Sequence, residues 1–176
     1  MGKRMSKRTS RCLQTTLESW ESGLARLGEA IVGFNRIEDA LARCIASMIG
    51  RDRHLGDILT AELSFRASVV VFEALFLHRS KLPALPAELR DVIARIHEAE
   101  QIRNGLVHAD WDANPRQPTT IRKTKMSIRA RKGLQKAIED VAPDDLDELT
   151  RTFAGIADDL WYMMQEYLPR FAARLR

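Results

Sequence analysis

The chain has 176 residues, of which 45% are hydrophobic and 30% charged, which is enough to form one core without disulfides or metals. Its two cysteines exclude a disulfide-stapled scaffold, and no cysteine or histidine spacing is typical of a metal site, so we expect neither metal nor cofactor. The apolar runs are far shorter than the roughly 18 residues of a membrane span. The basic start has no apolar stretch behind it, as a signal peptide would. We therefore expect a cytoplasmic protein with no membrane partner.

The net charge of +4 is unevenly distributed. Residues 1–11 carry five basic side chains and no acidic one, and residues 116–136 carry eight basic side chains and no acidic one. The rest of the chain then has 15 basic and 24 acidic residues. An acidic body with two basic segments favours a polyanionic partner, although such segments are also common as solvated tails. We interpret residues 1–15 as a basic tail and residues 16–176 as a single domain.

Helical periodicity dominates the first hundred residues. Apolar residues at spacings of three, four and seven predict a first helix that ends at Gly50. A second helix, from Leu59 to His78, is apolar nearly all round. Its two apolar faces are Leu63, Ala67, Val70, Ala74 and Leu77 on one side and Phe65, Val69, Phe72 and Phe76 on the other. Such a helix must be covered on both faces, by its own bundle and by a partner, so we expect a homodimer in which the second and third helices contribute to the seam.

The second half of the chain predicts a third helix after Pro86, a basic arm, and a last helix that begins at Pro143. A turn-rich stretch at residues 112–118 precedes residues 119–130, which show no helical stripe. We predict a basic β-hairpin or arm at about residues 116–136. Its candidate RNA-binding residues are Arg122, Lys123, Lys125, Arg129, Arg131 and Lys132. The predicted fold class is all-α, an up-down four-helix bundle with this hairpin inserted before the last helix.

When the third helix is projected at 100° per residue, two ionisable side chains, Glu100 and Arg103, fall within its apolar stripe. Burying each of them costs several kcal/mol unless it is paired or lies in a functional cavity. One interpretation is a structural ion pair, joined by Glu38 on the inward face of the first helix. The other is a polar site at the centre of the bundle or of a dimer seam.

A polar flank next to these charges favours the second interpretation. His97, Asn104 and His108 all lie within about 40° of one another on the helical projection. Asn104 and Gly105 form a helix-stop signal, which predicts a break that brings His108 round towards Arg103.

Residues 101–111, QIRNGLVHADW, resemble the Arg-Asn-x-x-x-His signature of HEPN (higher eukaryotes and prokaryotes nucleotide-binding) domains. Residues 34–41 and 61–68 are similar to the family's first two bundle helices. The tryptophan after the motif, the basic stretch and the final leucine-striped helix also recur in such proteins, so the resemblance covers about residues 24–170. It implies an all-α, usually dimeric fold. In many members it implies a metal-independent endoribonuclease of a toxin or phage-defence system, with an antitoxin or defence component as partner. On this resemblance Arg103, Asn104 and His108 are the candidate catalytic residues.

The chemistry of RNA cleavage agrees with these residue types. The reaction needs a base for the 2′-hydroxyl, an acid for the leaving oxygen and positive charge at the developing phosphorane. Histidine titrates near neutral pH, and arginine makes fixed, bidentate phosphate contacts. Each chain has a single histidine in the motif, so we expect two motifs to meet across a dimer, with Glu100, Glu38 and His97 in support.

Two other functions stay open at this point. One is a non-catalytic RNA- or nucleotide-binding module of the same fold. The other is a helical dimeric interaction protein whose polar residues only fix the register of the dimer.

Overall fold

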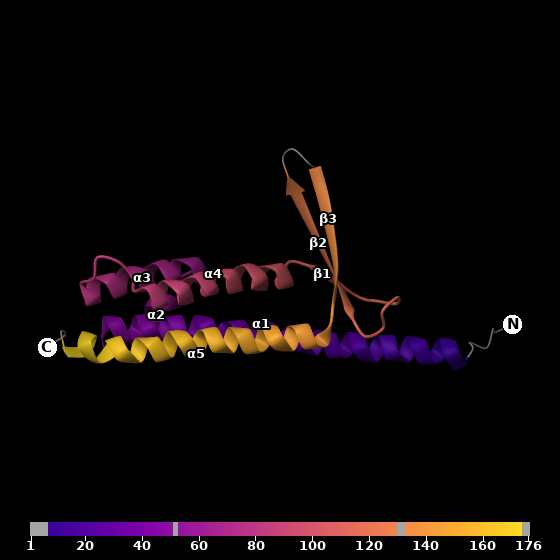
Figure 1. Cartoon of the computed structure of the whole chain (residues 1–176), viewed down its shortest axis with the longest axis horizontal. Helices are drawn as coiled ribbons and strands as arrows, with labels where there is room; N and C mark the ends of the chain where they lie inside the picture. The colour runs from indigo at the N-terminus through magenta and orange to yellow at the C-terminus, as the bar shows by residue number, and fades with distance from the viewer. Residues whose placement is uncertain (1–6, 51–52, 130–132, 174–176) are drawn as a thin grey trace. The chain divides into compact units, whose positions relative to one another are not determined.

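The computed structural model describes residues 7–50, 53–129 and 133–173. The chain is mostly helical (74%), with several packed helices and a three-stranded antiparallel sheet before the last helix, as Figure 1 shows. The elements in chain order are α1 (Lys7–Ile49), α2 (Arg53–Ala61), α3 (Phe65–Ser80), α4 (Ala87–Val107), β1 (Asp110–Ala113), β2 (Ile121–Arg129), β3 (Gly133–Val141) and α5 (Pro143–Ala173). None of the helices in these ranges is long and apolar enough to cross a membrane.

The chain forms two compact units. The sheet unit comprises Met1–Val32 and Gln101–Arg151, and the helical unit comprises Gly33–Glu100 and Thr152–Arg176. The division falls inside α1, α4 and α5, so each of these helices contributes residues to both units.

The helical unit has an aromatic core. Its fully buried phenylalanines are Phe34, Phe72, Phe76, Phe153 and Phe171. The rings of Phe34 and Phe153 meet edge to face with centroids 5.6 Å apart, and Phe76 meets Phe171 at 5.7 Å. In the same unit, the guanidinium of the half-buried Arg43 lies 4.6 Å from the ring centroid of Trp161. The phenylalanine face of α3 therefore packs inside its own chain, and Val70, on the other face, is 59% exposed. The premise that the phenylalanine face needs a partner subunit to cover it was wrong, and the expected homodimer seam of the second and third helices stays a prediction.

The predicted second helix is in fact two helices. α2 ends at Ala61, and α3 begins at Phe65 after Ser64, whose Oγ accepts a hydrogen bond from the backbone N–H of Ala67 at 3.2 Å. This N-cap satisfies one of the free N–H groups of the first turn, which makes Ser64 a favourable point for a new helix. The described residues thus hold five helices, where we predicted four.

The first and second helices of the chain meet closely. A side-chain carbon on Gly56 of α2 would overlap Ala46 of α1, so glycine allows the two backbones to approach. α1 ends at Ile49, before Gly50, as predicted. The guanidinium of Arg79 caps this end: its Nε donates to the carbonyl of Met48 at 2.7 Å and its Nη2 to that of Ile49 at 3.3 Å.

The sheet unit has a smaller core that joins α1, α4 and α5 to the sheet. Its buried residues are Leu27, Ala30, Leu106, Ile121, Val141 and Leu146, with Trp20 and Trp111 packed against them. Gly23 of α1 lies directly against Ile121 of β2, where a larger residue would overlap the isoleucine side chain. The close approach of helix and strand buries the base of the sheet.

The β-hairpin before the last helix is confirmed, but its limits differ from the prediction. The strands pair in the order β1-β2-β3, and the hairpin extends to Val141 instead of ending at Lys136. The expected tail at residues 1–15 is helical from Lys7, and residues 1–6 lie outside the described ranges. α5 begins at Pro143 as predicted and continues through Pro169.

Candidate functional site

The three candidate catalytic residues lie at the end of α4, in the sheet unit. Arg103 and Asn104 are in the last two turns, and His108 directly follows Val107, the last helical residue. The backbone N–H of His108 donates to the carbonyl of Asn104 at 3.1 Å, which continues the helical pattern. The predicted break at Asn104 and Gly105 is therefore wrong. Gly105 and Leu106 are buried, and packing of this turn overrides the local stop signal.

Because α4 stays helical, its geometry fixes how these residues are distributed around it. At 100° per residue, Asn104 and His108 lie about 40° apart, whereas Arg103 and His108 lie about 140° apart. Asn104 is half-buried and His108 is exposed. One chain therefore presents an asparagine and a histidine on one side of the helix end, with Arg103, half-buried, on another side.

A tryptophan anchors this helix end. The indole Nε1 of Trp111, in β1, donates to the carbonyl of Leu106 at 2.9 Å, and its ring packs against the core of the sheet unit. This carbonyl is one of those that a helix leaves without an intrahelical partner. The bond closes a short loop around His108 and ties the candidate site to the sheet.

The three expected supporting residues belong to the helical unit. The side chain of Glu100 is 12% exposed and forms an ion pair with Arg66 of α3, with 3.9 Å between Oε2 and Nε. His97 is half-buried. Glu38, expected on the inward face of α1, is exposed and lines a cavity of about 290 Å³ together with Thr60 of α2.

The hairpin is less positive than its predicted range implies. Arg122 forms an ion pair with Asp140, with 2.9 Å between Nε and Oδ1, and Lys123 pairs with Glu139, with 2.9 Å between Nζ and Oε2. Hydrogen bonding to Asp140 raises the pKa of Arg122, and hydrogen bonding from Arg122 lowers the pKa of Asp140. Both carboxylates lie just beyond residue 136, where the predicted segment stopped.

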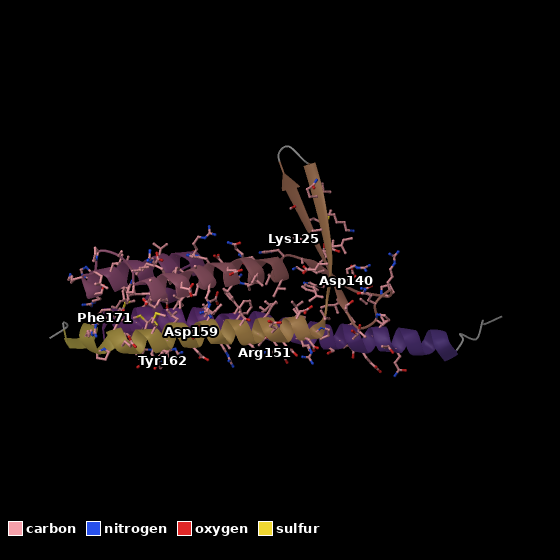
Figure 2. All side chains as sticks on the ribbon, viewed as in Figure 1. Lys125, Asp140, Arg151, Asp159, Tyr162 and Phe171 are labelled. Atoms are coloured by element: carbon pink, nitrogen blue, oxygen red, sulfur yellow. The ribbon has the colours of Figure 1, made fainter. Side chains whose placement is uncertain are left out.

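The other predicted RNA-binding residues divide into two groups. Lys125 is exposed and lies nearer the tip of the hairpin than Asp140 does, as Figure 2 shows. The side chain of Arg129 and the whole of Arg131 and Lys132 lie outside what the structure describes.

One polar residue that sequence reasoning missed holds the base of the hairpin. Asn114 is fully buried in the loop between β1 and β2. Its Oδ1 accepts hydrogen bonds from the backbone N–H of Arg116 and Gln117 and from Nη2 of Arg122, at 3.1, 3.3 and 3.0 Å. Its Nδ2 donates to Oγ1 of Thr120 at 3.0 Å. The signal was an asparagine before a proline, which is typical of a turn closed by an asparagine side chain.

In the described ranges, no group of three or more histidine, cysteine, aspartate and glutamate side chains could hold a metal ion. Comparisons with protein-family models, curated proteins and solved structures find no match to this chain.

Proposed function

We propose that this protein is a HEPN-like, dimeric, metal-independent endoribonuclease of the cytoplasm, of the toxin or phage-defence type, built on a bundle of the HEPN kind. The observation that carries the proposal is the position of Asn104 and His108 on one side of an anchored helix end, in the same compact unit as a hairpin with basic residues. The reaction class and the expected antitoxin or defence partner come from the resemblance of residues 101–111.

The proposed reaction is attack of the RNA 2′-oxygen on the adjacent phosphorus. His108 accepts the proton of the 2′-hydroxyl, the bond from phosphorus to the 5′-oxygen breaks, and the partner subunit's His108 donates a proton to that oxygen. Arg103 stabilises the charge on the phosphorane, and Asn104 hydrogen-bonds a phosphate oxygen. The products are a 2′,3′-cyclic phosphate and a 5′-hydroxyl. The geometry supports the use of two subunits, because Arg103 and His108 of one chain lie on different sides of α4.

The hairpin supplies affinity for the phosphate backbone in this proposal. Lys125 is exposed and contributes directly. Arg122 and Lys123 contribute less, because each already faces a carboxylate of β3.

The proposal is tested by RNA cleavage in the presence of a chelator, with a melting curve for each variant. His108 is exposed, so His108→Ala should change stability by no more than about 0.5 kcal/mol. It should reduce cleavage by roughly 100-fold or more. Arg103→Ala should also abolish cleavage while leaving a folded protein. His78→Ala is the matched control, because His78 is another exposed histidine near a helix end, and it should keep full activity. Full activity of His108→Ala would refute the proposal.

A helical dimeric interaction protein is the second candidate. The ion pairs of Arg122 and Lys123 favour it, because they reduce the positive charge available to a polyanion. RNA binding through lysine and arginine weakens steeply with added salt. Absence of salt-sensitive RNA binding by the wild-type protein would support the interaction protein, and salt-sensitive binding without cleavage would support a non-catalytic RNA-binding module.

A further inference from the structure

β3 is the outer strand of the sheet. The strand order is β1-β2-β3, and in the described part of the chain β3 pairs with β2 alone. The strand is nine residues long, and residues 134–140 are all exposed. An exposed edge of this length offers a row of backbone N–H and C=O groups to another strand, and proteins usually shorten or cover such edges.

The ribbon formed by β2 and β3 also has an exposed apolar face. Met126, Leu134 and Ile138 are 47%, 61% and 57% exposed. Residues directly opposite each other in an antiparallel pair share a face, and faces alternate along each strand. The register pairs Met126 with Lys136 and Thr124 with Ile138, so all three apolar residues lie on one face. Large exposed apolar side chains gathered beside an open edge mark this ribbon as an interaction surface.

The sequence of β3 is compatible with antiparallel pairing to its own copy about an axis at Ile138. A two-fold axis perpendicular to the sheet puts the same face of both copies on the same side. Because opposite residues share a face, the axis must lie midway between one residue of β3 and the same residue of the partner, and we call this an axis through that residue. An axis through Lys136 sets lysine against lysine, and an axis through Glu139 sets glutamate against glutamate. An axis through Ala137 sets Leu134 against Asp140. Like charges in opposite positions destabilise a pair of strands, and a carboxylate is a poor neighbour for leucine.

An axis through Ile138 avoids all of these conflicts. It sets Ile138 against the partner's Ile138 and Lys136 against the partner's Asp140, twice by symmetry. Within one chain, Asp112, Arg122 and Asp140 already lie opposite one another across the three strands. The partner's Lys136 continues this row with alternating charges.

We infer that two copies of this chain pair through the β3 edges, antiparallel and about a two-fold axis at Ile138, to form a continuous six-stranded sheet. The register sets Asp110, Thr124 and Ile138 opposite one another, so this pairing leaves the two copies of β1, and the His108 residues that precede them, at the two outer edges of the joined sheet. The interface is therefore separate from the contact that would bring two His108 residues to one phosphate, and it does not rest on RNA cleavage.

Disulfide cross-linking at the axis tests the register. Opposite residues of antiparallel strands have Cα atoms about 4.5–5.5 Å apart, within the roughly 4.4–6.8 Å range of a disulfide. We expect Ile138→Cys, in a Cys12→Ser background, to form a covalent dimer under mild oxidation. Cys44 is buried and stays reduced. Gln135→Cys is the matched control, because residue 135 faces the partner's residue 141 and lies about 20 Å from its own copy. It should cross-link at least about tenfold more slowly.

A charge reversal tests the interface in solution. Lys136→Glu turns both cross-interface pairs into repulsions and should weaken the dimer, measured by sedimentation velocity, by about tenfold. Lys125→Glu is the control, because Lys125 is exposed on the opposite face of the ribbon and should leave the dissociation constant nearly unchanged. Melting curves verify that each variant folds.

Three outcomes would overturn the inference: a wild-type monomer at tens of micromolar, equal cross-linking at positions 135 and 138, or equal weakening by both lysine variants. A dimer that cross-links at position 138 without cleaving RNA would refute the ribonuclease and leave this interface standing. Cleavage by a dimer that does not cross-link at position 138 would refute the interface alone.

Discussion

Asn114 is the residue whose replacement most directly tests how the hairpin is held. It is fully buried and makes four side-chain hydrogen bonds, three of them as acceptor. Asn114→Ala removes all four. A net contribution of roughly 0.5–1.5 kcal/mol per hydrogen bond gives about 2–6 kcal/mol. The lower end applies, because Arg116 and Gln117 are exposed and their N–H groups can bind water instead. We therefore expect a loss of about 2 kcal/mol in the free energy of unfolding.

The assay is urea denaturation followed by circular dichroism, with thermal melting as a second measurement. For a chain of this length, about 2 kcal/mol corresponds to a fall of roughly 4–8 °C in Tm. Gln117→Ala is the control, because its exposed side chain should leave stability within about 0.5 kcal/mol of the wild type. Asn114→Asp keeps the three acceptor bonds and loses the one to Thr120, so its loss should be smaller than that of Asn114→Ala.

A second measurement distinguishes the proposed network from a general packing effect. The Asn114 side chain contributes, after Arg122, to the lowered pKa of Asp140. Asn114→Ala should therefore raise the pKa of Asp140, as followed by nuclear magnetic resonance, and a volume effect alone would not. If the free energy of unfolding of Asn114→Ala is within about 0.5 kcal/mol of the wild-type value and the pKa of Asp140 is unchanged, Asn114 does not hold the hairpin.

Three further predictions concern other parts of the chain. Gly56→Ala should destabilise the protein by about 1–3 kcal/mol in urea denaturation, because the added methyl group overlaps α1. Gly28→Ala is the control: it lies in α1 with open space around it and should stabilise the protein by about 0.5–1 kcal/mol. Equal effects of the two variants would contradict the close approach of α1 and α2. Burial raises the pKa of the Cys44 thiol from 9.0 to about 12, so the folded state keeps a proton that the unfolded state loses above pH 9. The stability advantage of wild type over Cys44→Ala should fall by about 1.4 kcal/mol between pH 8 and pH 10, and a constant difference would show that the thiol ionises normally. The hydrogen bond from Arg122 lowers the pKa of Asp140, so the pair stabilises the fold at pH values above the ordinary pKa of 3.8, and this stabilisation is lost as the pH falls through the lower folded value. Arg122→Gln should raise the pKa of Asp140. An unchanged pKa would show that the ion pair is absent in solution.

The long helices were predictable because apolar spacing and terminal residues agree. Gly50 and Pro143 mark a helix end and a helix start that the structure confirms. The break between α2 and α3 was missed because the apolar spacing continues through Leu63, and only the side chain of Ser64 defines the new start. β3 was cut short because its sequence, GLQKAIEDV, mixes charges with little strand-like alternation. Its pairing with β2 is a long-range property that no local pattern reports.

The candidate site was predicted in its residues but not in its geometry. A helix-stop signal at Asn104 and Gly105 is a local preference, and burial of Gly105 and Leu106 outweighs it. The pairing of Arg122 with Asp140 depends on strand register, which was unknown from the sequence. Counting basic residues along a segment therefore overstated its positive charge.

The bond between Trp111 and the end of α4 makes that indole a fluorescent reporter of the candidate site. The chain has three tryptophans: Trp20 and Trp111 lie in the sheet unit, and Trp161 lies under Arg43 in the helical unit. Variants that keep a single tryptophan would follow each unit separately through a denaturant titration. Coincident emission changes would mean that the chain melts as one cooperative body. An earlier red shift at Trp111 would place the least stable part of the protein around His108, where a bound ligand could act by ordering it.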